Sequence, residues 1–374
     1  MKIHILTGHF HPQVHPRAFR SHELATELAR QGHDVTVTSL TTIRCFDYEA
    51  YARETGVKVR LMGLYEESPQ KSRGRNSAAG VSWAGRLYRF LLTYLLDGAT
   101  IFQARRISRR LHIDSDTQMV IALSTPFMCQ YGLSLYMRRQ AHSFVAVADS
   151  GDPFYLSHQN RRAPWFRGIE RRVYQTFRFL CIPTEAALPA YKGLLPQEKI
   201  RIIPQGFRMD NLPQGHVPHD GPVRFAYAGV FYWDIRNPEF IFRYLNGVSE
   251  PFEFHIYMRF QDALVDSLLG RYPHLHSRVV MHYAVPHDAL LSELCSMHFL
   301  LNIENAHSTQ LPSKLIDYGM AGRPIFSCNE SNFRPERLHG FLHGQYEGAL
   351  QVDIAQYDIR RIASQFLGLA TEGL

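Results

Sequence analysis

The stretch "KIHILTGHFHPQVHPRAFRSHELATELARQGHDVTVTSL", residues 2–40, reads as strand, loop, helix and strand. Residues 2–7 are short and apolar, as a buried strand is, and residues 34–40 repeat that pattern. Between them, apolar positions at helical spacing continue up to Gly32, and glycine commonly ends helices. A helix between two apolar strands predicts a parallel sheet and an α/β fold.

The same alternation continues along the chain. Two near-continuous apolar runs, "MVIALS" at 119–124 and "FVAVAD" at 144–149, are typical of strands covered on both faces by helices. Further strand-like runs follow, "FLCIPT" and "IRIIPQG", and the pattern restarts after residue 222 with "VRFAYAG", "FEFHIY", "RVVMHY", "HFLLNI" and "PIFSC". We therefore expect two Rossmann-like, doubly wound domains with a ligand cleft between them.

A change of composition marks the boundary between the two domains. At 374 residues the chain is too long for one ordinary core. Residues 210–222 are rich in Pro, Gly and His and lack an apolar period, which indicates a linker. The expected division is an N-terminal domain at 1–209, a C-terminal domain at 223–353, and a terminal helix at 354–374 that packs back on the N-terminal domain.

Composition and cysteine usage indicate a soluble cytoplasmic protein. Hydrophobic residues make up 45% of the chain and charged residues 20%, the usual balance of a globular protein. No apolar run is long enough to span a membrane, and the N-terminus lacks the apolar segment of a signal peptide. The five cysteines are scattered and form no CxxC pair, which favours buried thiols in a reducing compartment.

The net charge of +7 is concentrated in one segment. Residues 71–110 contain nine Lys and Arg and one Asp, which is a local charge of +8. Leu, Phe, Trp and Tyr at helical spacing accompany these cations, so we expect peripheral contact with an anionic surface, the inner face of the cytoplasmic membrane. A core helix with basic flanks is the alternative. Nucleic-acid binding is not expected, because no recognised binding motif accompanies the charge.

A short helix in the C-terminal domain carries the strongest ligand signal. In "LPSKLIDYGMAGRPIFSC", residues 311–328, Pro312 suits the first helical position, and the unpaired N–H groups of the first turn attract anions. Lys314 adds a positive charge where the helix dipole disfavours one, so a phosphate is expected there. Asp317, one turn after Ser313, can accept hydrogen bonds from a vicinal diol such as a ribose. The alternative is an ordinary capped helix with a solvated lysine.

A second basic helix start lies in the same domain. In "AGVFYWDIRNP", residues 228–238, Gly229 ends a strand and lets a ligand approach the backbone. Arg236 directly precedes a helix that we expect Asn237 to cap. Arg236 and Lys314 are together expected to clamp a diphosphate. A surface arginine beside a capped helix is the alternative.

Loops after the strands of the N-terminal domain are expected to hold the acceptor. They supply six candidate residues: Gly8, His9, Arg17, Ser124, Asp149 and Asp152. The carboxylates of Asp149 and Asp152 can orient an acceptor hydroxyl or serve as a base, although a simple Asp-Pro turn would have the same sequence. His9 and His11 form a His-x-His pair of the kind found in metal hydrolases, but no further ligands complete the set, so no metal is expected.

Four segments resemble landmarks of the GT-B-fold glycosyltransferases of family 4, a large retaining group. They are "HFHPQVHPRAFRSHELATELARQGHDVTVTS", "IRIIPQGF", "AGVFYWDIRNP" and "LPSKLIDYGMAGRPIFS", in the family's order. The resemblance implies that the second domain binds a nucleotide-sugar donor, with Arg236 at its diphosphate. It also implies that Ser313 and Lys314 approach the phosphates and that Asp317 holds the ribose. The family's other acid, which contacts the donor sugar, falls on Thr309, so that carboxylate is missing.

The resemblance further implies transfer of a sugar with retention, without a metal or another cofactor. The leaving nucleoside diphosphate would be stabilised by Arg236 and Lys314. The acceptor would be a glycan or a lipid-linked glycan of the bacterial surface-polysaccharide type. Two alternatives remain open: a non-catalytic GT-B scaffold subunit, which the absence of an acid at Thr309 would suit, and a GT-B-fold nucleotide-sugar epimerase, which needs cleft carboxylates and no acceptor.

Overall fold

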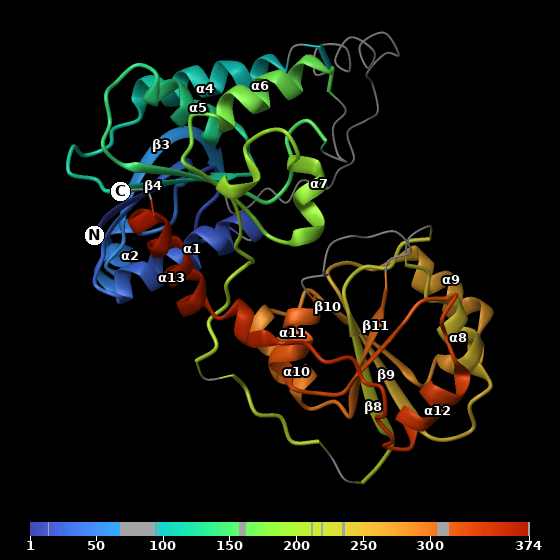
Figure 1. Cartoon of the computed structure of the whole chain (residues 1–374). Coiled ribbons are helices and arrows are strands. Elements are labelled where there is room, and N and C mark those ends of the chain that lie inside the picture. Colours follow the sequence, from blue (N-terminus) through green and yellow to red (C-terminus); the bar gives the residue numbers. More distant parts are fainter. Residues whose placement is uncertain are drawn as a thin grey trace. The chain divides into compact units, whose positions relative to one another are not determined.

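The computed structural model describes residues 1–13, 15–67, 94–95, 97–156, 162–210, 212–217, 220–233, 236–304 and 314–372. The chain forms two compact units, one of Met1–Arg208 with Gln356–Leu374 and the other of Met209–Ala355. Each unit is built on one parallel sheet flanked by helices (Figure 1). No helix in the described ranges is long and apolar enough to cross a membrane.

The first unit contains a seven-stranded parallel sheet in the order β3-β2-β1-β4-β5-β6-β7. Its strands are β1 (Lys2–Thr7), β2 (Asp34–Ile43), β3 (Lys58–Glu67), β4 (Met119–Ser124), β5 (Val145–Ser150), β6 (Phe179–Ile182) and β7 (Ile200–Ile202). Because successive side chains point to opposite faces, Ile3 and Ile5 enter one buried core and Leu6 enters another. The sheet is therefore covered on both faces, as the continuous apolar runs predicted.

Two helical layers cover this sheet (Figure 1). On one face α4 packs on α5, and α5 packs on α6; on the other, α1 packs on α2 and on α13. The helices are α1 (Pro16–Arg30), α2 (Tyr48–Thr55), α4 (Gly98–Arg110), α5 (Met128–Met137), α6 (Trp165–Tyr174), α7 (Leu188–Tyr191) and α13 (Ile359–Glu372), with short 3-10 turns η1 (Glu185–Ala187) and η2 (Gln197–Lys199).

The last helix, α13, belongs to the core of the first unit. The Phe207 N–H donates to the Tyr357 carbonyl oxygen at 2.7 Å, and the Ile359 N–H donates to the Phe207 carbonyl oxygen at 2.9 Å. Ile362 and Phe366 are then fully buried in the same core as β1. The helix starts later than residue 354, because Ile354–Tyr357 form a 3-10 turn, η4.

The second unit contains a five-stranded parallel sheet in the order β10-β9-β8-β11-β12. Its strands are β8 (Val223–Ala228), β9 (Phe252–Met258), β10 (Val279–Tyr283), β11 (Phe299–Ile303) and β12 (Ile325–Cys328). Its helices are α8 (Glu239–Asn246), α9 (Ala263–Arg271), α10 (His287–Cys295), α11 (Lys314–Ala321) and α12 (Pro335–Leu342), with a 3-10 turn η3 (Pro273–Leu275). Strands β8, β9 and β11 share one aromatic-rich core with α8, α9 and α12.

The described part of the expected linker packs on the second unit. The Cys295 thiol donates to the Pro213 carbonyl oxygen at 3.1 Å. Gly215 lies so close to α10 that a Cβ there would come within 2.1 Å of the Cys295 carbonyl carbon. Pro213 and Gly215 therefore lie against the end of α10, and a glycine is needed where the two backbones meet.

Candidate functional site

The second sheet changes winding direction between β8 and β11. From β8 the strand order proceeds through β9 to β10, and from the neighbouring β11 it proceeds to β12 on the other side. Loops that leave such a pair of strands diverge, which is where ligands of doubly wound folds bind. Arg236 follows β8 and Lys314 begins α11 after β11, so both predicted cations lie in loops and helices that leave this point.

The two cations meet at the side chain of Tyr227, a buried residue of β8. Lys314 Nζ lies 4.3 Å from the centroid of the Tyr227 ring, and Arg236 Nη1 donates to the Tyr227 hydroxyl at 3.3 Å. That hydroxyl donates to the Val230 carbonyl oxygen at 3.1 Å. The negative face of the ring stabilises the ammonium group, while the phenol oxygen accepts from the guanidinium.

Lys314 is short of negative charge. Its side chain is buried, with 8% of the residue exposed, and its ammonium group lies 3.4 Å from the Ile303 carbonyl oxygen. No ion pair joins it to a carboxylate among the residues that the structure describes. Burial, and then the charge of Arg236, hold the pKa of Lys314 well below its ordinary value. An anion bound beside both cations would remove this penalty.

Two further residues shape this end of the sheet. The buried Tyr318 hydroxyl on α11 donates to the Leu301 carbonyl oxygen at 3.1 Å and accepts from the Ala228 N–H at 2.8 Å, which ties α11 to both central strands. Gly229 has a φ of +132°, a conformation that residues with a Cβ rarely adopt. The turn after β8 therefore requires glycine.

Asp317 is already engaged by a histidine that sequence reasoning missed. Its Oδ1 accepts from His287 Nε2 at 2.9 Å, and its side chain is 18% exposed. His287 begins α10, thirty residues away in sequence. This hydrogen bond is the main reason why the pKa of His287 is raised, while burial acts in the opposite direction. The carboxylate is thus held in place on the side of α11 that faces α10.

The structure describes some of the predicted donor-side residues and leaves others outside its described ranges. Arg236, Lys314 and Asp317 gather around Tyr227 and α11, as described above, whereas Thr309, Pro312 and Ser313 lie outside the described residues. The contributions of Tyr227, Tyr318 and His287 were not predicted. The only local signal for Tyr227 was its place in an apolar strand, which does not distinguish a site residue from a core residue.

In the first unit, Gly8 and Ser124 lie at the neighbouring carboxyl ends of β1 and β4, where that sheet also reverses direction. A Cβ on Gly8 would come 2.1 Å from Cδ of Pro126, so the two loops are in close contact. Ser124 is buried, and its hydroxyl lies 3.1 Å from the Ser150 hydroxyl. Ser124 therefore supports the strand ends from inside, and Gly8 allows the loops to approach.

Asp149 is held in a buried ion pair. Arg20 Nε and Nη2 donate to its two carboxylate oxygens at 2.5 and 2.7 Å, and Arg17 Nη1 lies 4.0 Å from the same carboxylate. Asp149 is 1% exposed, whereas Asp152 is exposed. Arg17 lies against Gly151, since a Cβ there would fall 0.7 Å from its Nη2. As placed, Asp149 anchors α1 to β5 and Asp152 presents the accessible carboxylate.

The His9 and His11 side chains do not converge on one point. The His9 ring stacks on His15 with centroids 4.1 Å apart, and the His11 ring stacks on His22 at 4.6 Å. Burial lowers the pKa of His11, because it disfavours the protonated ring. In the described part of the chain, the group of three possible metal ligands that does come together lies in the second unit, at Glu250, His339 and His343.

No family model and no curated protein matches the sequence. Solved structures match along the whole chain. Sucrose-phosphate synthase from Thermosynechococcus elongatus matches with a TM-score of 0.60 at 12% identity, over 100% of this chain and 98% of that chain. Anabaena HepE in complex with UDP matches with a TM-score of 0.59 at 10% identity, over 100% of both chains. The apo lipopolysaccharide outer core galactosyltransferase WaaB gives 0.57 at 10%, again over 100% of both.

The chain has the GT-B fold. Its two parallel sheets, of seven and five strands with alternating helices, are the two Rossmann-like domains of that fold, and the predicted fold class is confirmed. Identities of 10–12% carry the likeness of fold and nothing finer.

The first prediction concerns Asp149 in the first GT-B domain. Asp149→Ala leaves the buried Arg20 guanidinium without its carboxylate, which typically costs about 3–5 kcal/mol of unfolding free energy. Urea unfolding of the full chain measures this loss. Asp152→Ala removes a neighbouring exposed carboxylate and should stay within about 0.5 kcal/mol of the parent. Equal losses in the two variants would contradict a structural role for Asp149.

The second prediction concerns pH. Because the pKa of His287 is raised in the folded chain, its ion pair with Asp317 contributes fully below the ordinary histidine pKa of 6.5 and is lost as the pH rises through the raised value. At acidic pH the unfolding free energy of the parent should exceed that of His287→Gln by about 0.5 kcal/mol. The difference is small because the ion pair is partly exposed. Thermal unfolding of both proteins at several pH values measures the difference. A difference that grows with pH would contradict this assignment, and His274→Gln, an exposed histidine on η3, is the control.

Proposed function

We propose that this protein is a glycosyltransferase that moves a sugar from a nucleotide-sugar donor to a glycan or lipid-linked glycan acceptor. The observation that supports it best is the buried Lys314, which shares the Tyr227 side chain with Arg236 at the switch point of the second sheet. Two cations held this close create a place for a ligand with more than one negative charge. A nucleoside diphosphate has that charge, and it is the leaving group of such a reaction.

In the proposed reaction, negative charge develops on the diphosphate as the bond to the sugar breaks. Arg236 and Lys314 stabilise that charge in a partly buried setting, where fixed cations act more strongly than in water. The Asp317 carboxylate, which His287 holds by a hydrogen bond, accepts hydrogen bonds from the ribose hydroxyls. We propose retention of configuration and no metal requirement, as the resemblance to family 4 implies. We also propose that Gly229, Thr309, Pro312 and Ser313 belong to the donor site, as predicted from the sequence.

The structural neighbours support the donor class and the acceptor class. HepE was determined with UDP and, in a second structure, with UDP and glucose. WaaB is a galactosyltransferase of the lipopolysaccharide outer core. We therefore propose a nucleotide sugar as donor and a surface-type glycan as acceptor, bound by the loops of the first domain near Gly8, His9, Arg17 and Asp152. A thermal-shift screen with UDP-, GDP-, ADP- and CMP-sugars identifies the donor, because a ligand raises the stability of the state that it binds.

Two other functions are distinguished by product analysis with the donor that the screen identifies. A non-catalytic scaffold releases no nucleoside diphosphate with any donor, with or without acceptor. An epimerase converts the donor sugar when no acceptor is present. A transferase releases the diphosphate slowly by hydrolysis and faster with acceptor. The missing acid at Thr309 is the feature that favours the scaffold, and the paired cations favour a bound diphosphate.

The third prediction tests the paired cations. Lys314→Ala and Arg236→Ala should each weaken binding of the matching nucleoside diphosphate by about tenfold or more, which is about 1.4 kcal/mol. Binding of the nucleoside alone should change little, because it carries no phosphate. Isothermal titration calorimetry of both ligands measures the ratio.

The control for this experiment is Arg224→Ala. Arg224 lies near the start of β8, at the amino ends of the strands and away from Arg236 and Lys314, and it pairs with Glu253. This variant should bind the nucleoside diphosphate as the parent does. The diphosphate assignment fails if Lys314→Ala and Arg236→Ala lose affinity for nucleoside and nucleoside diphosphate equally, or if neither loses affinity.

We also propose that the first domain contacts an anionic membrane surface. Much of the basic segment 71–110 lies outside the described residues, but α4 is described and has no acidic residue. Phe102, 61% exposed, shares one side of α4 with the exposed Arg105 and Arg109. An exposed aromatic ring beside cations suits the interface of a bilayer with anionic headgroups.

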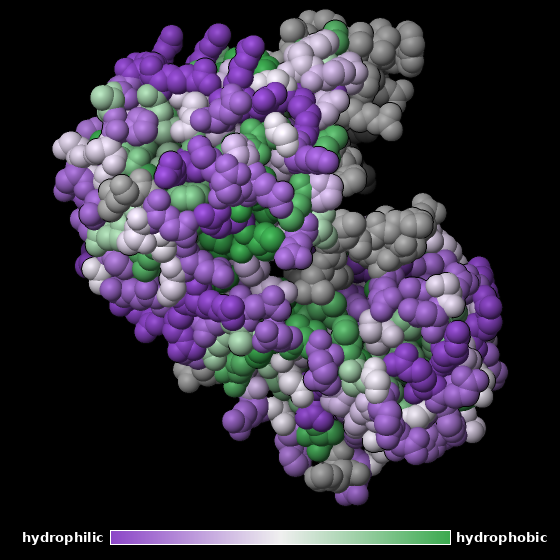
Figure 2. Space-filling model, viewed as in Figure 1, coloured by the Kyte–Doolittle hydropathy of each residue, from purple (hydrophilic) through white to green (hydrophobic). Residues whose placement is uncertain are grey.

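Helix α6 of the same domain carries further exposed cations. Trp165 is 53% exposed at the start of α6, and Arg171 and Arg172 are exposed on the same helix. The one acid of α6, Glu170, is buried and accepts from the Phe154 N–H at 2.8 Å. The surface over α4 and α6 is mostly hydrophilic (Figure 2). Exposed cations on α4 and α6, together with the exposed rings of Phe102 on α4 and Trp165 on α6, support binding to lipid headgroups.

The fourth prediction concerns this face. The protein should float with vesicles that contain anionic lipid and not with neutral vesicles, and Arg105→Glu combined with Arg109→Glu should abolish flotation. Arg53→Glu, on α2 of the same domain, changes an exposed arginine elsewhere and should have little effect. Flotation that does not depend on anionic lipid, or that survives the double substitution, would contradict the proposal.

A further inference from the structure

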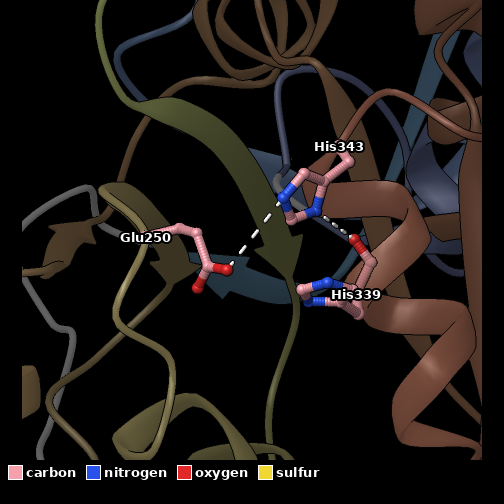
Figure 3. Close-up of side chains that lie close together, drawn as sticks. All are labelled: Glu250, His339 and His343. Atoms are coloured by element: carbon pink, nitrogen blue, oxygen red, sulfur yellow. Dashed lines mark hydrogen bonds and ion pairs between the residues drawn. The ribbon is translucent and has the colours of Figure 1, made fainter.

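Two histidines and a glutamate come together in the second domain, near the amino end of β9. The predicted donor-side residues that the structure describes lie at the carboxyl ends of the strands, on the other side of the sheet's long axis. His339 lies in the last turn of α12 and His343 caps that helix, so a spacing of four places both rings on one side. Their ring centroids are 4.3 Å apart. Glu250 comes from the turn before β9, and its carboxylate points toward His343 (Figure 3). One ligand atom of each residue lies within 4.8 Å of the others.

We propose that Glu250, His339 and His343 form a binding site for a zinc ion. Imidazole nitrogens and a carboxylate oxygen are donors that Zn²⁺ accepts, and water completes the coordination of a site with three protein ligands. None of the three residues was among the sequence candidates, because Glu250 is about ninety residues away from the two histidines. The proposal is independent of the proposed sugar transfer, because it concerns the amino end of β9 and the end of α12 and none of the predicted donor-side residues.

The hydrogen bonding of His343 prepares its other nitrogen for a metal. His343 Nδ1 lies 2.9 Å from the His339 carbonyl oxygen. A carbonyl oxygen only accepts, so Nδ1 carries the hydrogen, and Nε2 of the neutral ring presents a lone pair. That Nε2 lies 4.0 Å from Glu250 Oε1. Metal-bound histidines characteristically donate their second N–H to a carbonyl or carboxylate oxygen in this way.

The Glu250 carboxylate is also held in place. Its Oε2 accepts from the Ser249 hydroxyl at 3.3 Å, which leaves Oε1 to face His343. Arg278 Nη1 donates to the Val248 carbonyl oxygen at 2.6 Å and lies 3.4 Å from the Glu250 carbonyl oxygen. These contacts fix the turn from which Glu250 projects. Ligand carboxylates in metal sites are commonly supported by such additional hydrogen bonds.

The spacing suits a metal better than a direct hydrogen bond. At 4.0 Å, the Nε2–Oε1 separation is too long for a hydrogen bond. Two bonds of the length that zinc forms, at a tetrahedral angle, separate their donor atoms by about 3.4 Å. The His343 and Glu250 side chains are 45% and 40% exposed, so small rotations close the difference. Bound zinc would link α12 to the turn between α8 and β9 and stabilise the domain against unfolding.

The experiment uses the full chain after removal of metal with a chelator. Competition with a chromophoric zinc chelator should show a site in the parent that His339→Ala and His343→Ala each weaken by at least about tenfold. Glu250→Gln should weaken it less, because an amide oxygen is a poorer ligand than a carboxylate. Added zinc should raise the unfolding temperature of the parent, and it should raise that of the His339→Ala, His343→Ala double variant by less.

The controls address the other histidines, of which the chain has twenty in all. His274→Ala, at an exposed position of η3 in the same domain, should bind zinc as the parent does. Because the substituted side chains are partly or largely exposed, the variants should match the parent's unfolding temperature without zinc. The proposal is overturned if the parent binds no zinc, or if its affinity is the same in His339→Ala and His343→Ala.

Discussion

The hydroxyl of Tyr318 is the contact on which the carboxyl ends of the two central strands of the second sheet depend. It donates to the Leu301 carbonyl oxygen of β11 and accepts from the Ala228 N–H of β8, so one buried group joins the two strands between which the sheet reverses. Backbone groups buried near strand ends need such partners. Because Tyr318 belongs to α11, the same two hydrogen bonds place the helix that carries Lys314 and Asp317.

The two domains hold buried cations in different ways. The Nε and Nη2 groups of Arg20 donate to the two carboxylate oxygens of Asp149, and this ion pair joins α1 to β5. Lys314 has an aromatic ring, a carbonyl oxygen and the repulsion of Arg236. A matched pair supports the fold, whereas a buried charge that lacks a counter-charge lowers stability and favours an anionic ligand. This contrast distinguishes Asp149, whose carboxylate has a structural role, from Lys314, for which we propose an anionic ligand.

Periodicity predicted the central strands well and an edge strand poorly. The runs that became β4 and β5 are apolar up to their last one or two residues, because helices cover both of their faces. Strand β3 was not predicted: among the described residues it pairs only with β2, and polar or exposed side chains such as Lys58 and Leu61 interrupt its apolar pattern. Turn chemistry was more dependable, since Gly32, the glycine expected to end the first helix, has a left-handed φ of +85°.

The sequence by itself determined the α/β class, the two domains, and the positions of Arg236 and Lys314 after strands, because apolar period and helix punctuation are properties of neighbouring residues. Only the tertiary structure decided that both cations contact the Tyr227 side chain and that His287 is hydrogen-bonded to Asp317. It also decided that Asp149 forms a buried ion pair with Arg20. These contacts join segments far apart in the chain. Strand order and sheet register bring them together, and no local pattern encodes which side chains then meet.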